Sequence, residues 1–179
     1  MRARITTFAL LLLALLTFGV LAAGCGEEPE TEVMEGEPLE LGDLHFNVQI
    51  TRFLNPSSDE DAAYLEGAPP LVGEQQYLGV FMQIENVGDA EAVVPFPFRI
   101  IDTRGEIYVQ DRVDNDFALI PDTPIPADGT VPGLETPART GPIEGSMILF
   151  RVDEAAVEDR PLKLEVRSGD EIGEVELDL

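Results

Sequence analysis

The sequence contains one cysteine, Cys25, one histidine, His45, and only 11 lysine and arginine residues against 35 aspartate and glutamate residues. A single cysteine cannot form an internal disulfide, so the fold must be stabilised by burial of apolar surface. Any Ser-His-Asp triad would have to use His45, which we expect on the outward face of a strand. The net charge of -24 repels the phosphates of nucleic acid and argues against a nucleic-acid-binding function.

Residues 1–24 have the layout of a secretory signal peptide. Two arginines precede an uncharged, leucine-rich run that ends in small residues directly before Cys25. This ending resembles a bacterial lipobox, although Leu21 lies one place before the commonest leucine position. In lipoproteins the cysteine sulfur receives a diacylglyceryl group and cleavage, here between Gly24 and Cys25, makes the cysteine the first residue. Two or three acyl chains such as palmitate then hold the protein on the membrane.

An uncleaved membrane-spanning helix of about 20 apolar residues is the alternative interpretation of this segment. Both interpretations place the rest of the chain outside the cytoplasm, and the lipobox predicts a lipid-anchored protein of the bacterial cell membrane. Removal of the signal leaves nine basic residues against 35 acidic ones, a net charge near −26. We interpret this acidity as a solvated surface that keeps the protein soluble; a surface that binds cations or a basic partner is the sharper hypothesis.

The rest of the chain suits one domain preceded by a tether. Residues 25–37 include six glutamates and little that could be buried, which predicts a disordered acidic tether. Apolar and polar residues alternate through much of 38–179, as in strands with one wet face. A short helix is expected at 153–160. The alternating or apolar strand segments are 46–50, 77–85, 98–109 as a hairpin, 146–152, 162–166 and 175–179.

Seven to nine short strands, separated by glycine, proline and aspartate turns, predict an all-β fold, an antiparallel β-sandwich over 38–179. Residue faces follow from the alternation: Phe46, Val48 and Ile50 are expected to point to one side of their strand. Two long connections, 55–76 and 121–142, are either functional or loosely ordered.

The order of these segments resembles the bacterial lipoprotein domain of unknown function 4352. The matching pieces are 77–91, 98–108 and 145–153. The family shares an immunoglobulin-like sandwich with the mycobacterial immunoprotective extracellular, or telokin-like, proteins, so the resemblance implies that fold and brings no established activity or ligand. The acidic insertion near Asp59 departs from the family's pattern. The matching turn, hairpin and late-strand residues, which all have structural explanations, are Asn86 with Gly88, Asp102 with Gly105, and Phe150 with Val152.

Acidic loops provide weak candidates for a calcium site, because calcium takes six to eight oxygen ligands. Neither loop matches an EF-hand, and a solvated acidic turn is the alternative. The methionines and His45 show no spacing suited to copper or zinc, so no other cofactor is expected. The calcium candidates are Asp59 and Asp61 in the first long connection, and Asp111, Asp114 and Asp116 after the hairpin.

No residue set in the sequence forms a catalytic constellation, so we expect a protein that is not an enzyme. The leading hypothesis is a membrane-anchored, extracytoplasmic binding or interaction module for an unidentified protein or envelope ligand. The alternative is a structural or stress-related envelope protein with an acidic surface that could hold calcium. An exposed apolar patch would favour the first, uniform acidity the second, and His45 in a pocket between two carboxylates would favour an enzyme.

Overall fold

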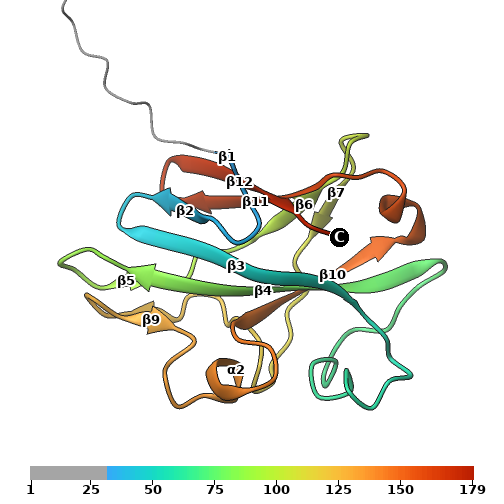
Figure 1. The fold of residues 1–179 in the computed structure, drawn as a ribbon, viewed down its shortest axis with the longest axis horizontal. Coiled ribbons are helices and arrows are strands. Elements are labelled where there is room, and N and C mark those ends of the chain that lie inside the picture. Colours follow the sequence, from blue (N-terminus) through green and yellow to red (C-terminus); the bar gives the residue numbers. More distant parts are fainter. Residues whose placement is uncertain (1–31) are drawn as a thin grey trace, which may run out of the picture.

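The computed structural model describes residues 32–179, which form a β-sandwich of two main sheets (Figure 1). The predicted signal peptide, Cys25 and the tether as far as Thr31 lie outside the described residues. None of the helices within 32–179 is long and apolar enough to cross a membrane. The predicted β-sandwich is confirmed, while its immunoglobulin-like character stays a prediction.

Sheet A has the strand order β1-β12-β11-β6-β7, and sheet B has the order β10-β4-β3-β2 with β9 also paired to β4. The described chain has more strands than the seven to nine predicted because several contain only two or three residues. Sheet A consists of β1 (Glu32–Met34), β6 (Arg99–Ile101), β7 (Ile107–Val109), β11 (Leu162–Ser168) and β12 (Glu171–Leu177). Sheet B consists of β2 (Pro38–Leu41), β3 (Leu44–Leu54), β4 (Gln75–Asn86), β9 (Thr130–Val131) and β10 (Ser146–Asp153).

Three small elements complete the fold. A two-stranded ribbon pairs β5 (Ala92–Val93) with β8 (Pro124–Ile125). The helix α2 covers Pro137–Thr140, and a 3-10 helix, η1, covers Glu154–Val157. The η1 helix lies inside the segment 153–160, so the helix predicted there is confirmed in its central turn.

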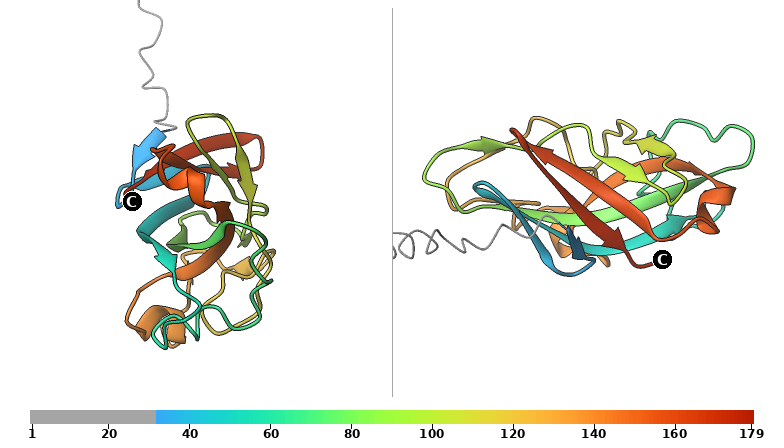
Figure 2. Two further views of the ribbon diagram at one scale, coloured as in Figure 1. Left: turned by 90° about the vertical axis from the view of Figure 1, so that its right-hand side faces the viewer. Right: turned by 90° about the horizontal axis from the view of Figure 1, so that it is seen from above.

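The main core lies between the two sheets (Figure 2). The inward side chains of β4 are those that its alternation predicts, and they pack with inward residues of β11, β12 and β10. The rings of Phe46, in β3, and Phe98, directly before β6, meet edge to face with their centroids 6.4 Å apart. Gly173 lets β12 approach β2 closely, since a β-carbon there would lie 2.6 Å from the Leu39 side chain. The four inward residues of β4 are Leu78, Val80, Met82 and Ile84.

A bulge in β3 corrects one predicted face. The pairing of β3 with β4 shifts by one residue between Val48 and Ile50. As a result Ile50, expected beside Phe46 and Val48, is 39% exposed, and Thr51 takes the buried position. A bulge adds one residue to one strand only, so every later residue of that strand changes face.

The predicted boundary between tether and domain at residue 38 is wrong. Glu32–Met34 forms β1, parallel to β12, with Val33 buried opposite Val175. Glu35 then links the two sheets, because its carboxylate accepts hydrogen bonds from the N–H groups of Thr51 at 3.0 Å and Asp178 at 3.1 Å. This strand could not be predicted from composition, because only one residue of the glutamate-rich stretch buries an apolar side chain.

The first long connection, 55–76, and the segment 113–118 pack against the outer face of sheet B, where they form a second, smaller core (Figures 1 and 2). The outward side chains of β10, Met147 and Leu149, lie in it. The Tyr64 ring lies 5.2 Å from that of Phe81 and 4.6 Å from that of Phe117, measured between centroids. The buried side chains of the first connection therefore cover this face of the sheet, so that connection is not loosely ordered in these parts.

Candidate functional site

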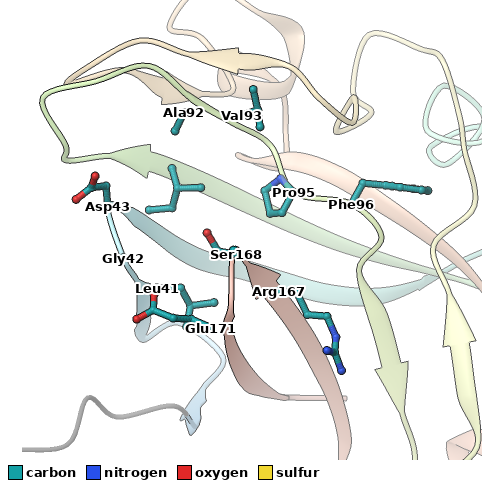
Figure 3. Close-up of a pocket in the computed structure, with 12 residues that line it drawn as sticks. Leu41, Gly42, Asp43, Ala92, Val93, Pro95, Phe96, Arg167, Ser168 and Glu171 are labelled. Carbon is teal, nitrogen blue, oxygen red and sulfur yellow. The ribbon is translucent and has the colours of Figure 1, made fainter.

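A cleft of about 520 Å³ opens at one end of the sandwich, between the ends of the two sheets. We call it the end cleft. Figure 3 shows the segment from Ala92 to Phe96 on one side, and the β2–β3 and β11–β12 turns on the other. The lining residues are Leu41, Gly42, Asp43, Leu44, Ala92, Val93, Pro95, Phe96, Arg167, Ser168, Gly169 and Glu171.

Tight turns form one wall of the end cleft. Gly42, with φ of 58°, lies in the β2–β3 hairpin, and Gly169, with φ of 61°, lies in the β11–β12 hairpin. Both values are in the left-handed region that glycine adopts without strain. The two hairpins therefore present Asp43 and Glu171 at the rim, next to the apolar Leu41 and Leu44.

The opposite wall of the end cleft is apolar and partly open to solvent. Val93 is 52% exposed and Phe96 is 37% exposed. The Arg112 guanidinium lies over the Phe96 ring, 4.3 Å from its centroid, a cation–π contact. Exposed valine and phenylalanine side chains beside a concave site are typical of surfaces that bind another molecule.

The positive charge at this rim is already engaged by an acid. Arg167 donates hydrogen bonds from Nε and Nη2 to the two carboxylate oxygens of Glu165, at 2.9 and 3.1 Å. These bonds raise the pKa of the Arg167 guanidinium. The remaining charged side chains of the lining, Asp43 and Glu171, are acidic, so the rim favours a ligand with neutral or cationic polar groups.

A second concave surface, which we call the polar groove, lies on the outer face of sheet B, beside β9 and α2 of the second long connection. It has a volume of about 390 Å³. Its walls carry hydrogen-bonding side chains from β3, β4, β9 and α2. They are His45, Asn47, Gln49, Gln83, Glu85, Thr130 and Arg139; Pro38 and Ile84 complete the lining, and the Ile84 side chain is buried in the main core.

His45 lies in this groove between two carboxylates, the arrangement that would favour an enzyme. It is paired across the sheet with Glu40 on β2 and Glu85 on β4. Its Nε2 atom is 3.9 Å from Glu40 Oε1, beyond hydrogen-bond distance. No serine lines the groove, and the one hydroxyl there, on Thr130, makes no hydrogen bond to His45 in the described chain. The arrangement therefore lacks the nucleophile–base contact of a hydrolytic triad.

The structure does not bring the calcium candidates together. Asp111 binds Arg151 through both carboxylate oxygens, at 2.8 and 2.9 Å, and these bonds raise the pKa of Arg151. Asp61 is buried and is engaged by Arg52 and by the N–H of Asn55. Within 32–179 no group of three or more acidic, histidine or cysteine residues is placed to hold a metal ion. Asp59, Asp114 and Asp116 are exposed loop residues.

The turn residues that carried the family resemblance have structural roles. The Asn86 amide donates hydrogen bonds to three carbonyl oxygens, those of Ala90, Ile125 and Pro126, and the N–H of Gly88 donates to its side-chain oxygen. Asp102 accepts from the N–H groups of two residues in its hairpin. Sequence motifs did not point to either concave surface, because the lining residues come from separated segments that only the topology joins.

Comparison with known proteins supports the fold alone. No protein-family model matches this sequence, and no curated protein matches it. An uncharacterized β-sandwich protein of Clostridium difficile 630 has a similar structure, with a TM-score of 0.52 and 13% identity over 85% of this chain and 97% of that one. The yjhA protein of Bacillus subtilis also gives 0.52 and 13%, over 81% and 99%. A functionally unknown protein of Listeria monocytogenes gives 0.50 and 10%, over 79% and 80%.

Proposed function

We propose that this protein is a membrane-anchored, extracytoplasmic binding module without enzymatic activity, and that the end cleft is where it binds its partner. The observation that carries the proposal is a cleft with an apolar wall, Val93 to Phe96, and an acidic rim, Asp43 and Glu171. Apolar walls with a few polar groups at the mouth are typical of binding sites of this size. The matching partner is a segment with an apolar side chain flanked by basic groups.

The exposed apolar wall favours this function over a purely structural envelope protein. An acidic surface that serves only solubility does not explain why Val93 and Phe96 lie at the mouth of a cleft. Their exposed apolar area there does not stabilise the fold as buried area would. Neither does a solubility role account for Arg112 placed over the exposed Phe96 ring. A second function, calcium binding, has no support in the positions of the acidic candidates.

The anchor in this proposal is a lipid on Cys25, which the lipobox resemblance supports. Six residues separate Cys25 from Glu32, where β1 begins. Even fully extended, this length spans at most about 25 Å. The domain would therefore stay close to the membrane surface, where a partner embedded in the envelope is within reach. We also propose that the chain is a divergent relative of the domain of unknown function 4352 with an immunoglobulin-like sandwich.

Site-specific photocrosslinking tests the end cleft. A photoreactive phenylalanine would replace Val93 in the full-length chain, and the control would carry it at Val72, which is 67% exposed and does not line the cleft. We expect a discrete adduct on irradiated cells from position 93, lost when Ala92→Arg fills the cleft, and none from position 72. Equal adducts at both positions, or an adduct that survives Ala92→Arg, would refute the cleft as the binding site.

Membrane fractionation tests the anchor separately. We expect the full-length protein in the membrane fraction and the Cys25→Ala variant to lose lipid labelling, as measured by incorporation of a radiolabelled fatty acid. A Thr31→Ala variant is the control, because it alters the same segment without removing the thiol. If the wild type is not labelled and both proteins stay in the membrane fraction, the lipoprotein assignment is contradicted and the uncleaved helix is favoured.

A further inference from the structure

The polar groove has a composition that is unusual for so acidic a chain. Within it lie three of the nine asparagine and glutamine side chains of the sequence, Asn47, Gln49 and Gln83, and the flanking His45 and Thr130 are also uncharged hydrogen-bonding groups. Alternation along β3 places its groove residues on one face. The groove is therefore a concentration of neutral donors and acceptors on a protein whose surface is otherwise dominated by carboxylates.

Several of these groups have hydrogen-bonding capacity to spare. Asn47 donates to the carbonyl oxygen of Gly36 at 3.3 Å, and Gln49 donates to the Asn47 side-chain oxygen. The Gln83 amide makes no hydrogen bond with another side chain or backbone group of the described chain, although it is half-buried. A planar amide offers two donor hydrogens and one acceptor oxygen on the same group.

Arg139 gives the groove one further donor group. It projects from α2, and it is half-buried. Six of the nine basic residues within 32–179 have a carboxylate within 4 Å, but Arg139 has none there. In a chain with 35 acidic residues, an arginine that borders a concave surface without an acidic partner is free to donate to a bound molecule.

The chemistry of the groove selects the class of ligand. Glu85 within it and Glu40 beside it repel phosphates and other dense anions. Pro38 alone offers too little apolar surface to bury an apolar ligand, because the Ile84 side chain is buried in the main core. A hydroxyl group is both donor and acceptor, so a row of amides, a histidine and an arginine is matched by a molecule with many neutral hydroxyl groups.

We infer that the polar groove binds a neutral polysaccharide, with Gln83 and Arg139 as hydrogen-bonding residues. The groove shares no lining residue with the end cleft. The inference is therefore independent of the proposed partner-binding role, and either can fail without the other. A glycan site on the sheet face would place the protein against the carbohydrate of the envelope while the end cleft contacts its partner.

Native gel electrophoresis of the protein from Gly26 onwards, in gels that contain a soluble polysaccharide, tests the inference. The probes are a β-glucan, a xylan, a mannan and glycol-modified chitin, with polygalacturonate as the anionic comparison. We expect at least one neutral polymer to retard the protein. Gln83→Ala and Arg139→Ala should each weaken that binding about fivefold, the equivalent of about 1 kcal/mol for a lost hydrogen bond.

Two further variants keep the test decisive. Gln76→Ala removes a glutamine of the same strand that lies outside the groove, and it should leave retardation unchanged. Gln83→Glu keeps the shape of the side chain while removing its donor, and covers the case in which the alanine variant does not fold. The inference is overturned if no neutral polymer retards the protein, if only polygalacturonate does, or if retardation survives the groove substitutions.

Discussion

Two buried tyrosine hydroxyls have opposite surroundings. Tyr77 donates a hydrogen bond to the carbonyl oxygen of Pro69 at 2.6 Å, whereas the Tyr108 hydroxyl is buried with no partner among the described residues. Leaving a buried polar group unpaired costs about 1–3 kcal/mol, and a satisfied hydrogen bond contributes about 1 kcal/mol. We expect Tyr108→Phe to raise the free energy of unfolding in urea by about 1 kcal/mol and Tyr77→Phe to lower it by as much. A loss of stability on Tyr108→Phe would contradict this.

The ionised Asp102 carboxyl makes the free energy of unfolding depend on pH. Burial acts to raise the pKa of its carboxyl, but hydrogen bonds from Glu106 and Arg104 outweigh it and lower the pKa below the usual range. A lowered native pKa stabilises the fold above the unfolded value of about 4, and this contribution disappears as the pH falls through the native pKa. We expect the unfolding free energy of Asp102→Asn to vary less between about pH 5 and pH 2 than that of the wild type. The measurement is urea unfolding at each pH.

The control for this pH dependence is Asp159→Asn. Asp159 also pairs with Arg104, at 2.9 Å, but its side chain is 27% exposed and lacks the backbone hydrogen bonds of Asp102. Its substitution should leave most of the wild-type slope in place. Equal slopes for the wild type and Asp102→Asn would show that the buried carboxyl does not carry the effect.

For single residues, the sequence predicted structural roles in turns better than it predicted hydrogen-bond partners. Asn86 and Asp102 were expected to be turn residues, and their hydrogen bonds confirm it. That the Asn86 amide also binds the Ile125 carbonyl, 39 residues away, could not be read from a local pattern. Ile50 was misplaced because the bulge before it leaves no mark in the sequence, where Gln49 simply continues the alternation.

Strand β1 could not be predicted from composition. Its removal tests directly how much it contributes to the stability of the fold. A chain that begins at Pro38 loses the burial of Val33, the β1–β12 pairing and the Glu35 bridge between the sheets. Burying one valine contributes about 1.5–3 kcal/mol, to which the hydrogen bonds add. We expect this chain to be less stable to urea than one beginning at Gly26 by about 3 kcal/mol.

The Glu35 bridge can be separated from the rest of β1. Glu35→Ala in the chain beginning at Gly26 should reproduce about 1–2 kcal/mol of the loss. Glu37→Ala is its control, because among residues 32–179 that carboxylate accepts only from the nearby N–H of Met34. If the chain beginning at Pro38 is as stable as the longer one, residues 32–37 are a tether in solution, as their composition suggests.

The second core shows which features of a whole strand could be predicted from the sequence and which could not. Met147 and Leu149 alternate with Ile148 and Phe150, so both faces of β10 are apolar and both need cover. The covering side chains, Tyr64 among them, belong to connections whose prolines and acids suggested loops. The need for a cover was therefore predictable, but which connection supplies it depends on the crossing of the chain over the sheet, which periodicity does not encode.

Over the whole molecule, acidic side chains far outnumber the basic side chains that could pair with them. Basic residues are few, and most are tied to acids, as in Lys163, whose pKa is raised by its bonds to Glu32 and Glu174. The remaining carboxylates repel one another across the surface. Such repulsion destabilises the compact state and is screened by salt, with a Debye length of about 10 Å at 0.1 M. The sequence predicted this acidity in full, since it depends on composition alone.

Thermal unfolding separates this general screening from a specific metal site. We expect the midpoint for the chain beginning at Gly26 to rise with sodium chloride, by about 3 °C for each kcal/mol of repulsion screened. Calcium and magnesium at equal concentration should then raise it equally, because the described residues hold no metal-binding cluster. A calcium site at 100 times its dissociation constant would add about 2.7 kcal/mol for calcium alone. A saturating rise with calcium that magnesium does not match, and that Asp114→Asn or Asp116→Asn abolishes, would restore the acidic loop as a calcium site.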